Sequence, residues 1–132
     1  MKVFLDTNVW LSAVIFPGLC ESLVMACAEH DWLLTSPLVR QEAHQVLARK
    51  FPLRADAPAL FDVSWNEARC IADVPDPADD NDARLVAAAV TAGADLFVSG
   101  DKRVLEWLAA GSLRIVSPRQ AWIILFEPQL NH

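Results

Sequence analysis

Residues 1–10 of the chain read MKVFLDTNVW, and the expected fold follows from this stretch. Residues 3–5 are apolar and predict a short buried strand, and Asp6, Thr7 and Asn8 follow it directly. In an open parallel sheet, ligands bind beyond the carboxyl ends of the strands. A carboxylate beside a buried strand also needs a partner or a metal ion to offset its lost hydration. Asp6 is therefore the first candidate site residue.

Four further apolar runs look like the first one. None alternates apolar with polar residues, which is typical of strands in a parallel sheet covered on both faces. The predicted strands are Val3–Leu5, Trp32–Thr35, Cys70–Val74, Leu96–Ser99 and Leu113–Val116.

Amphipathic stretches lie between these runs and predict helices. Ser36-Pro37 and Ser117-Pro118 have the residue types of a helix N-cap and first turn, and we expect Gly93 and Gly111 each to end a helix. The predicted helices are Leu19–Glu29, Pro37–Lys50, Pro58–Arg69, Asp82–Ala92, Lys102–Ala110 and Pro118–Phe126. Alternating strands and helices predict an α/β sandwich with a mostly parallel sheet of about five strands.

The composition predicts one domain over residues 1–132, with 54% hydrophobic residues to fill its core. No apolar run approaches the roughly 18 to 20 residues that span a bilayer, so we expect a cytoplasmic protein with no membrane segment. Cys20, Cys27 and Cys70 have no metal-ligand spacing and are expected to pack as small apolar residues. The net charge of −6 argues against nucleic-acid binding by overall positive charge.

Four acids are expected at the carboxyl edge of the sheet. Asp6 follows the first strand, Asp101 follows the strand that ends at Ser99, and Asp82 begins a helix. Glu42 lies at the border of the buried side of its own helix. Each acid alone has an ordinary explanation as a helix cap, a turn residue or a solvated side chain, and only their combination points to a site.

Several carboxylates held together repel one another unless a cation keeps them ionised. Oxygen ligands without a suitable His or Cys favour Mg²⁺ or Mn²⁺ over zinc. Such an ion promotes phosphodiester hydrolysis by activating water and neutralising charge on the phosphate. Thr7, Asn8 and Ser99 would then orient the ligands or the water.

The sequence resembles the PIN-domain ribonucleases, and especially the VapC-like toxins of toxin–antitoxin pairs. The similar stretches are FLDTNVWLSA, Glu42 in SPLVRQEAHQVL, DPADDNDARLVAAAVTAGADLFVSGD and LRIVSPRQAW, in the order of the family and over nearly the whole chain. The resemblance implies a PIN-like three-layer α/β/α sandwich and a metal-dependent endoribonuclease.

Matched position by position, the resemblance makes Asp6, Glu42, Asp82 and Asp101 the four metal-binding acids. Asn8 and Ser99 match polar site positions of the family. Asp79 and Asp80 are rivals for the third acid, and Asp82 is preferred because Ala83 follows it, as in the Asp-Ala motif of the family. The resemblance also implies an RNA substrate, a homodimer and a small antitoxin protein that covers the site.

Some remaining residues have two readings. Basic side chains either steer RNA or are simply solvated; they are Arg40, Arg49, Lys50, Arg54, Lys102 and Arg103. The tryptophans at 10, 65, 107 and 122 either stack on bases or pack in the core or a dimer, and packing is preferred. His30, His44 and His132 are assigned no catalytic role.

Two other functions compete with the ribonuclease. An aspartyl phosphatase would use Asp6 as nucleophile, but such enzymes usually need a second acid where Asn8 stands. A catalytically silent PIN-like or receiver-like module would use the acids only to bind a metal or a partner. The receiver version is disfavoured because the early Asp6 and the adjacent Asp101-Lys102 pair do not match its pattern.

Overall fold

The computed structural model describes residues 1–75 and 79–127. Asp76 of the acidic stretch and His132 lie outside these residues. Within them the chain forms six strands and seven helices in an α/β arrangement. The expectation of a mostly parallel α/β sandwich is confirmed.

The sheet has the strand order β3-β2-β1-β4-β6-β5. All neighbouring strands pair in parallel except β5, which is antiparallel to β6. The strands are β1 (Val3–Leu5), β2 (Leu33–Thr35), β3 (Arg69–Cys70), β4 (Leu96–Val98), β5 (Ala109–Ala110) and β6 (Leu113–Val116). Residues of β1, β2 and β4 are fully buried, as their continuous apolar character predicts.

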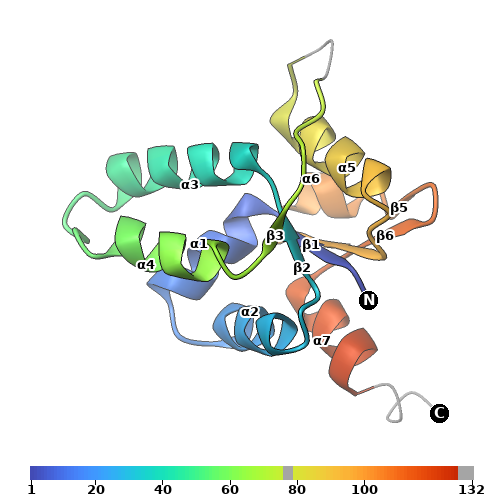
Figure 1. Cartoon of the computed structure of the whole chain (residues 1–132), viewed down its shortest axis with the longest axis horizontal. Coiled ribbons are helices and arrows are strands. Elements are labelled where there is room, and N and C mark those ends of the chain that lie inside the picture. Colours follow the sequence, from blue (N-terminus) through green and yellow to red (C-terminus); the bar gives the residue numbers. More distant parts are fainter. Residues whose placement is uncertain (76–78, 128–132) are drawn as a thin grey trace.

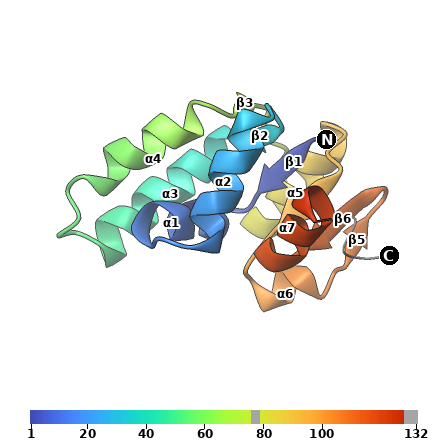
Figure 2. The same ribbon diagram turned by 90° about the horizontal axis from the view of Figure 1, so that it is seen from below.

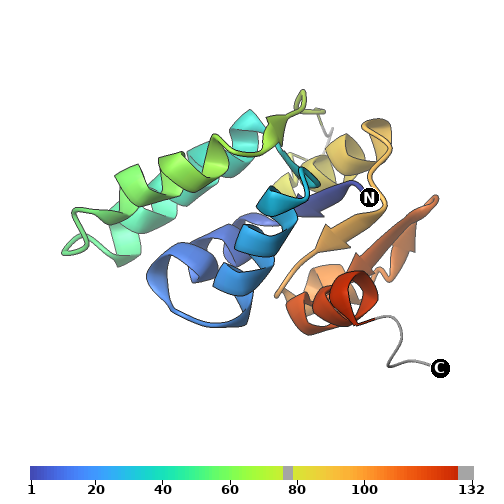
Figure 3. The same ribbon diagram turned by 60° about the horizontal axis from the view of Figure 1, so that its bottom comes forward.

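The helices are α1 (Thr7–Ile15), α2 (Leu19–Glu29), α3 (Pro37–Lys50), α4 (Ala57–Trp65), α5 (Asn81–Thr91), α6 (Lys102–Leu105) and α7 (Pro118–Phe126). Figure 1 shows α2 and α7 on one side of the sheet and α3 and α5 on the other. Seen from below in Figure 2, α2 and α7 lie next to each other, and Figure 3 shows α4 lying along α3. The sheet is thus the middle layer of three.

The buried core lies on both faces of the central strands. The rings of Phe4 and Phe97, on the neighbouring strands β1 and β4, stack with centroids 5.5 Å apart. Trp10 of α1 is fully buried and meets Phe61 of α4 edge to face. Trp10 therefore packs in the core, as the preferred reading of the tryptophans predicts. No single helix among the described residues is long and apolar enough to cross a bilayer; only α1 and α2 together, bent by 107°, meet that criterion.

Several predicted boundaries were wrong. The helix at Thr7–Ile15 was not expected, because its residues are apolar on most of its surface and show no amphipathic period. The strand predicted at Cys70–Val74 is the exposed pair Arg69–Cys70 at the sheet edge. The helix predicted at Pro58–Arg69 spans Ala57–Trp65 and then unwinds through turns into β3.

The helix predicted at Lys102–Ala110 ends at Leu105. Leu108 has a φ of +62°, which is incompatible with a continuing right-handed helix, and β5 then forms a hairpin with β6. Gly111 does not end a helix. It lies in the two-residue turn of this hairpin with a φ of +62°, a conformation that glycine adopts readily. Gly93, by contrast, follows α5 with a φ of +73°, as expected.

Candidate active site at the carboxyl edge of the sheet

Asp6 lies at the carboxyl end of β1, and its residue is 3% exposed. Its N–H donates to the Val98 carbonyl at 2.8 Å and so continues the pairing of β1 with β4. Its Oδ2 accepts hydrogen bonds from Ser99 Oγ at 2.8 Å and Asn8 Nδ2 at 3.1 Å, and its Oδ1 accepts one from the Thr7 N–H at 2.8 Å. Donors on both strand exits therefore fix the orientation of this carboxylate.

The loop after β4 is tied to the start of α1. Asn8 Oδ1 accepts a hydrogen bond from the Gly100 N–H at 2.9 Å, and a Cβ at Gly100 would stand 3.3 Å from that oxygen. The Asp101 N–H donates to Ser99 Oγ at 3.0 Å, and Asp101 Oδ1 accepts from the Arg103 N–H at 2.8 Å, which begins α6. Asp101 is thus held beside Asp6 by the same hydroxyl that binds Asp6.

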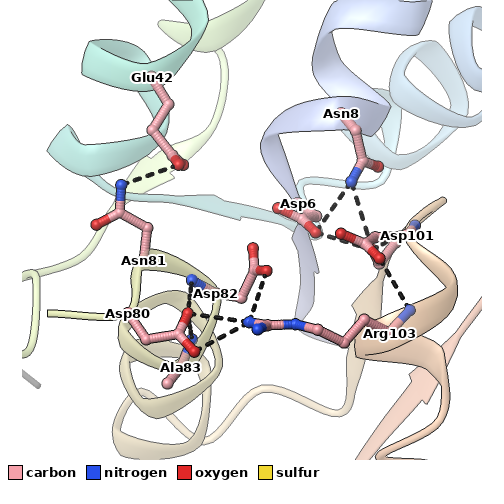
Figure 4. A network of polar contacts seen from close by, with 10 residues as sticks. Asp6, Asn8, Glu42, Asp80, Asn81, Asp82, Ala83, Asp101 and Arg103 are labelled. Carbon is pink, nitrogen blue, oxygen red and sulfur yellow. Dashed lines mark hydrogen bonds and ion pairs between the residues drawn. The ribbon is translucent and has the colours of Figure 1, made fainter. Parts of the chain in front are cut away.

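Glu42 reaches the same region from α3. Thr7 Oγ1 donates to its Oε1 at 2.8 Å. Asn81 Nδ2 donates to its Oε2 at 3.2 Å (Figure 4). These bonds connect α3 to α1 and α5. Asn81 was not among the predicted site residues, because only the acids of its stretch were weighed; its place beside Asp82 at the helix start is the signal that identifies it.

The three rival aspartates take different positions. Asp80 is the N-cap of α5, and its Oδ1 accepts hydrogen bonds from the N–H groups of Asp82 at 3.0 Å and Ala83 at 3.3 Å. Asp79 is exposed and has a φ of +52°. Asp82 lies in the first turn of α5, and its negative charge acts on Asp6. Among the three, Asp82 has the position that brings it together with Asp6.

The charges of these acids affect one another. Burial raises the pKa of Asp6 to about 6; the Ser99 hydrogen bond opposes this rise, and the charges of Asp82 and Glu42 add to it. Burial also raises the pKa of Asp82; Arg103 opposes that rise, and the charge of Asp101 adds to it. Asp6 and Asp82 are therefore less acidic than free aspartates.

The site also lies at the N-termini of two longer helices. Asp6 is the N-cap of α1 and Asp80 the N-cap of α5, and Asp82 is in the first turn of α5. The positive ends of these helix dipoles favour negative charge at this edge, whether carboxylate or phosphate.

The donor set is chemically suited to a hard divalent ion. Asp6, Glu42, Asp82 and Asp101 offer oxygen ligands only, which fit Mg²⁺ or Mn²⁺. In residues 1–75 and 79–127, however, no group of three or more His, Cys, Asp or Glu side chains is arranged to hold an ion. The residues present fit the ion by their chemistry, and their carboxylates would have to move closer together to bind it.

A hollow of about 380 Å³ opens beside the acids. Asn8, Gly100 and Asp101 line it on the side of the site, and Ser12 and Cys20 line it from α1 and α2. Its volume lies at the lower end of the range for small-molecule sites, so the space next to Asp101 is large enough for part of a ligand.

Two of the basic residues weighed for RNA steering are paired elsewhere. Arg40 and His44 both contact Asp62 of α4, with Arg40 Nη2 2.9 Å and His44 Nε2 2.8 Å from its oxygens. Arg54 pairs with Asp56 at 3.1 Å. The contacts of Asp62 join α3 to α4, and the Arg54–Asp56 pair lies in the connection between these two helices.

Comparisons with known proteins agree with this geometry. The sequence model of the PIN domain family matches residues 2–103. No curated protein matches the chain. Among solved structures, the chain is similar to the crystal structure of PAE2754 from Pyrobaculum aerophilum, with a TM-score of 0.71 and 14% sequence identity over 95% of this chain and 89% of that one. At this identity the likeness concerns the fold alone.

Proposed function

The chain belongs to the PIN domain family, and from this premise we propose that it is a Mg²⁺- or Mn²⁺-dependent endoribonuclease, the toxin of a toxin–antitoxin pair. PIN domains are generally nucleases, and PIN nucleases typically use divalent metal ions. The observation that carries the proposal is the convergence of Asp6, Asp82 and Asp101 at one edge of the sheet, where the charge of Asp82 raises the proton affinity of Asp6 and the charge of Asp101 raises that of Asp82.

The acids and their hydrogen-bond donors would have different roles in this reaction. Asp6, Asp82, Asp101 and Glu42 would hold the ion, which when bound supplies water activation and charge neutralisation at the phosphate. Ser99 and Asn8 keep the oxygens of Asp6 in place through their hydrogen bonds. In the reaction, water adds to phosphorus, the bond to the 3′-oxygen breaks, and that oxygen takes up a proton.

Thr7 and Asn81 would orient Glu42 in the same way, since each donates to one of its oxygens. The hollow beside Asn8 and Asp101 offers room for a nucleotide next to the scissile phosphate.

The test is cleavage of a mixed pool of structured and single-stranded RNA in Mn²⁺ or Mg²⁺. We expect fragments from the wild type, none in EDTA, and a loss of roughly a hundredfold or more in rate for Asp82→Asn. Asp31→Asn is the matched control: it makes the same chemical change at an exposed residue before β2, and Asn tolerates its φ of +59°.

Saturable Mn²⁺ binding without cleavage would replace this proposal by a silent PIN-like domain that binds a metal or a partner. Equal cleavage with and without EDTA would refute the metal dependence. Cleavage by Asp82→Asn at the wild-type rate would refute the assignment of Asp82.

We further propose a homodimer and a small antitoxin as partners, in the cytoplasm. Three large apolar side chains that border one hollow on α2 and α4 support a protein partner: Met25, Leu60 and Val63 are 59%, 47% and 65% exposed. Exposed apolar side chains that lie together are a feature of protein–protein interfaces. Light scattering at several protein concentrations tests the dimer, and a single mass equal to one chain at all of them would refute it.

A further inference from the structure

The guanidinium of Arg103 contacts one of the four site acids, Asp82, and also Asp80, the N-cap of α5. Arg103 Nη2 lies 2.9 Å from Asp80 Oδ2, 3.2 Å from Asp80 Oδ1 and 3.1 Å from Asp82 Oδ2. Figure 4 shows the side chain reaching from the start of α6 across to the start of α5. The same guanidinium lies over the ring of Trp107, 5.6 Å from its centroid.

This contact supplies the positive charge that Asp82 otherwise lacks. Asp82 faces the carboxylates of Asp101 and Asp80 and raises the proton affinity of Asp6. Arg103 is the residue whose charge and hydrogen bond favour the ionised form of Asp82. Acids gathered in this way need a cation, and here a side chain of the same chain provides it.

A divalent ion would require the same oxygen. Mg²⁺ binds carboxylate oxygens at about 2.0–2.1 Å and demands a regular arrangement of ligands. The ion and the guanidinium are both positive, so they repel each other when they share one carboxylate. Binding of either at Asp82 Oδ2 therefore weakens binding of the other.

We propose that Arg103 is an internal counter-ion of the site, which competes with the divalent ion for Asp82 and has to leave that carboxylate when the ion binds. This inference rests on the proposed metal-dependent function. It adds a positioning residue that is neither an acid nor a ligand.

The geometry allows the exchange at little cost. The Arg103 side chain is 57% exposed, and ion pairs so open to solvent are weak. Asp80 accepts two of the three contacts and is the N-cap of α5. After release from Asp82, the guanidinium keeps an anchor on Asp80 and remains beside the site, where an incoming phosphate would meet it.

The experiment is a calorimetric titration of Mn²⁺ into the full chain, without RNA. We expect Arg103→Met to bind Mn²⁺ about five- to tenfold more tightly than the wild type, because both the competing contact and the nearby charge are lost. Lys102→Met is the matched control: it removes the same charge from the neighbouring exposed residue, and we expect it to change the affinity by less than about twofold.

Arg103→Lys is the second variant, and it covers the case that Arg103→Met does not fold. A lysine keeps the positive charge but has a shorter side chain and lacks the guanidinium whose Nη2 contacts both carboxylates, so its Mn²⁺ affinity should fall between those of the wild type and Arg103→Met. Thermal unfolding of each protein in EDTA establishes that it is folded.

The outcomes separate the two proposals. Equal shifts for Arg103→Met and Lys102→Met, or weaker Mn²⁺ binding by Arg103→Met, would refute the competition while leaving the metal site intact. If Arg103→Met does not fold, an Arg103→Lys affinity equal to that of the wild type would refute it. No saturable Mn²⁺ binding by any folded variant would instead refute the proposed metal-dependent function.

Discussion

Asp6 combines deep burial with three hydrogen-bond donors. Thr7, Asn8 and Ser99 all donate to its carboxylate, which stabilises the ionised form, but burial and the charges of Asp82 and Glu42 outweigh them. The balance leaves the pKa of Asp6 at about 6, above its usual value of 3.8. The ionisation of Asp6 therefore lowers the stability of the folded state at neutral pH.

The stability of the wild type in EDTA should fall as the pH rises from about 4 to 6. Below 3.8 Asp6 is protonated in both the folded and unfolded states, and between 3.8 and about 6 only the folded state keeps the proton. Above about pH 6 the folded state carries the full cost of ionising the buried Asp6. At 1.36 kcal/mol per pKa unit, the rise from 3.8 to about 6 corresponds to a loss of roughly 3 kcal/mol in the free energy of unfolding.

Asp6→Asn has no ionisable group at this position, so comparing it with the wild type isolates the contribution of Asp6 to the pH dependence of stability. An asparagine has one oxygen for three donors, so lost hydrogen bonds cost the variant roughly 1–3 kcal/mol, and this part of the difference does not vary with pH. The difference in unfolding free energy between Asp6→Asn and the wild type should shift in favour of the variant by roughly 3 kcal/mol between pH 4 and 7.5. Urea unfolding in EDTA gives this difference, and a constant value over that range would contradict the assigned environment of Asp6.

At the residue scale, the sequence predicted which acids lie at the edge of the sheet but not that Asn81 and Arg103 contact them. Asp6, Asp82 and Asp101 follow from strand ends and a helix start, which are local features. The contacts of Asn81 with Glu42 and of Arg103 with Asp82 join residues 39 and 21 positions apart, and no local pattern carries that information. The catalytic and metal-binding roles of these acids stay predictions.

At the element scale, two Ser-Pro pairs with the same residue types cap their helices differently. Ser117 forms a full capping box at the start of α7: its Oγ accepts from the Gln120 N–H at 3.2 Å, and the Gln120 side chain accepts from the Ser117 N–H at 2.9 Å. Ser36 is buried before α3, and its hydroxyl has no partner among the described residues. The Asp73 carboxylate instead accepts a hydrogen bond from the Leu38 N–H at 3.1 Å, in place of a bond to the Ser36 hydroxyl.

The two serines should therefore respond differently to alanine. Ser117→Ala should lower the free energy of unfolding by about 1 kcal/mol, since it removes a working N-cap. Ser36→Ala should cost less than about 0.5 kcal/mol or be stabilising, since it removes a buried hydroxyl that makes no hydrogen bond. Urea unfolding at pH 7 measures both, and equal losses for the two variants would show that Ser36 caps α3 in solution.

The elements that the sequence missed share a cause. The Thr7–Ile15 helix has apolar residues around most of its circumference, so its period is hidden. The β5–β6 hairpin replaces the end of a predicted helix because Leu108 and Gly111 both have positive φ, and only the glycine signals this in the sequence. Short elements at sheet edges are decided by tertiary pairing rather than by local propensity.

At the scale of the whole molecule, the parallel arrangement of the central strands was predictable. Runs such as Val3–Leu5 and Leu96–Val98 are apolar throughout, which a half-exposed antiparallel strand would not allow. The order of the strands was not predictable, because β1 pairs with β2 and β4 through contacts across about 30 and 93 residues. That order places Asp6 between Ser36 and Ser99 and thus makes the site.

We expect the stability of the whole chain to depend on the divalent ion that these acids are proposed to bind. If the acids bind Mn²⁺ in the folded state only, saturating ion adds stability by mass action, about 2.7 kcal/mol at a hundred times the dissociation constant. For a chain of 132 residues this corresponds to a rise in Tm of roughly 10 °C, reversed by EDTA. The exposed Asp31 lies before β2, away from the acids, so Asp31→Asn should show the full rise, whereas Asp82→Asn should show little or none. Thermal unfolding followed by circular dichroism measures these shifts, and an equal rise in both variants would mean that Mn²⁺ stabilises the fold from another place than the carboxyl edge of the sheet.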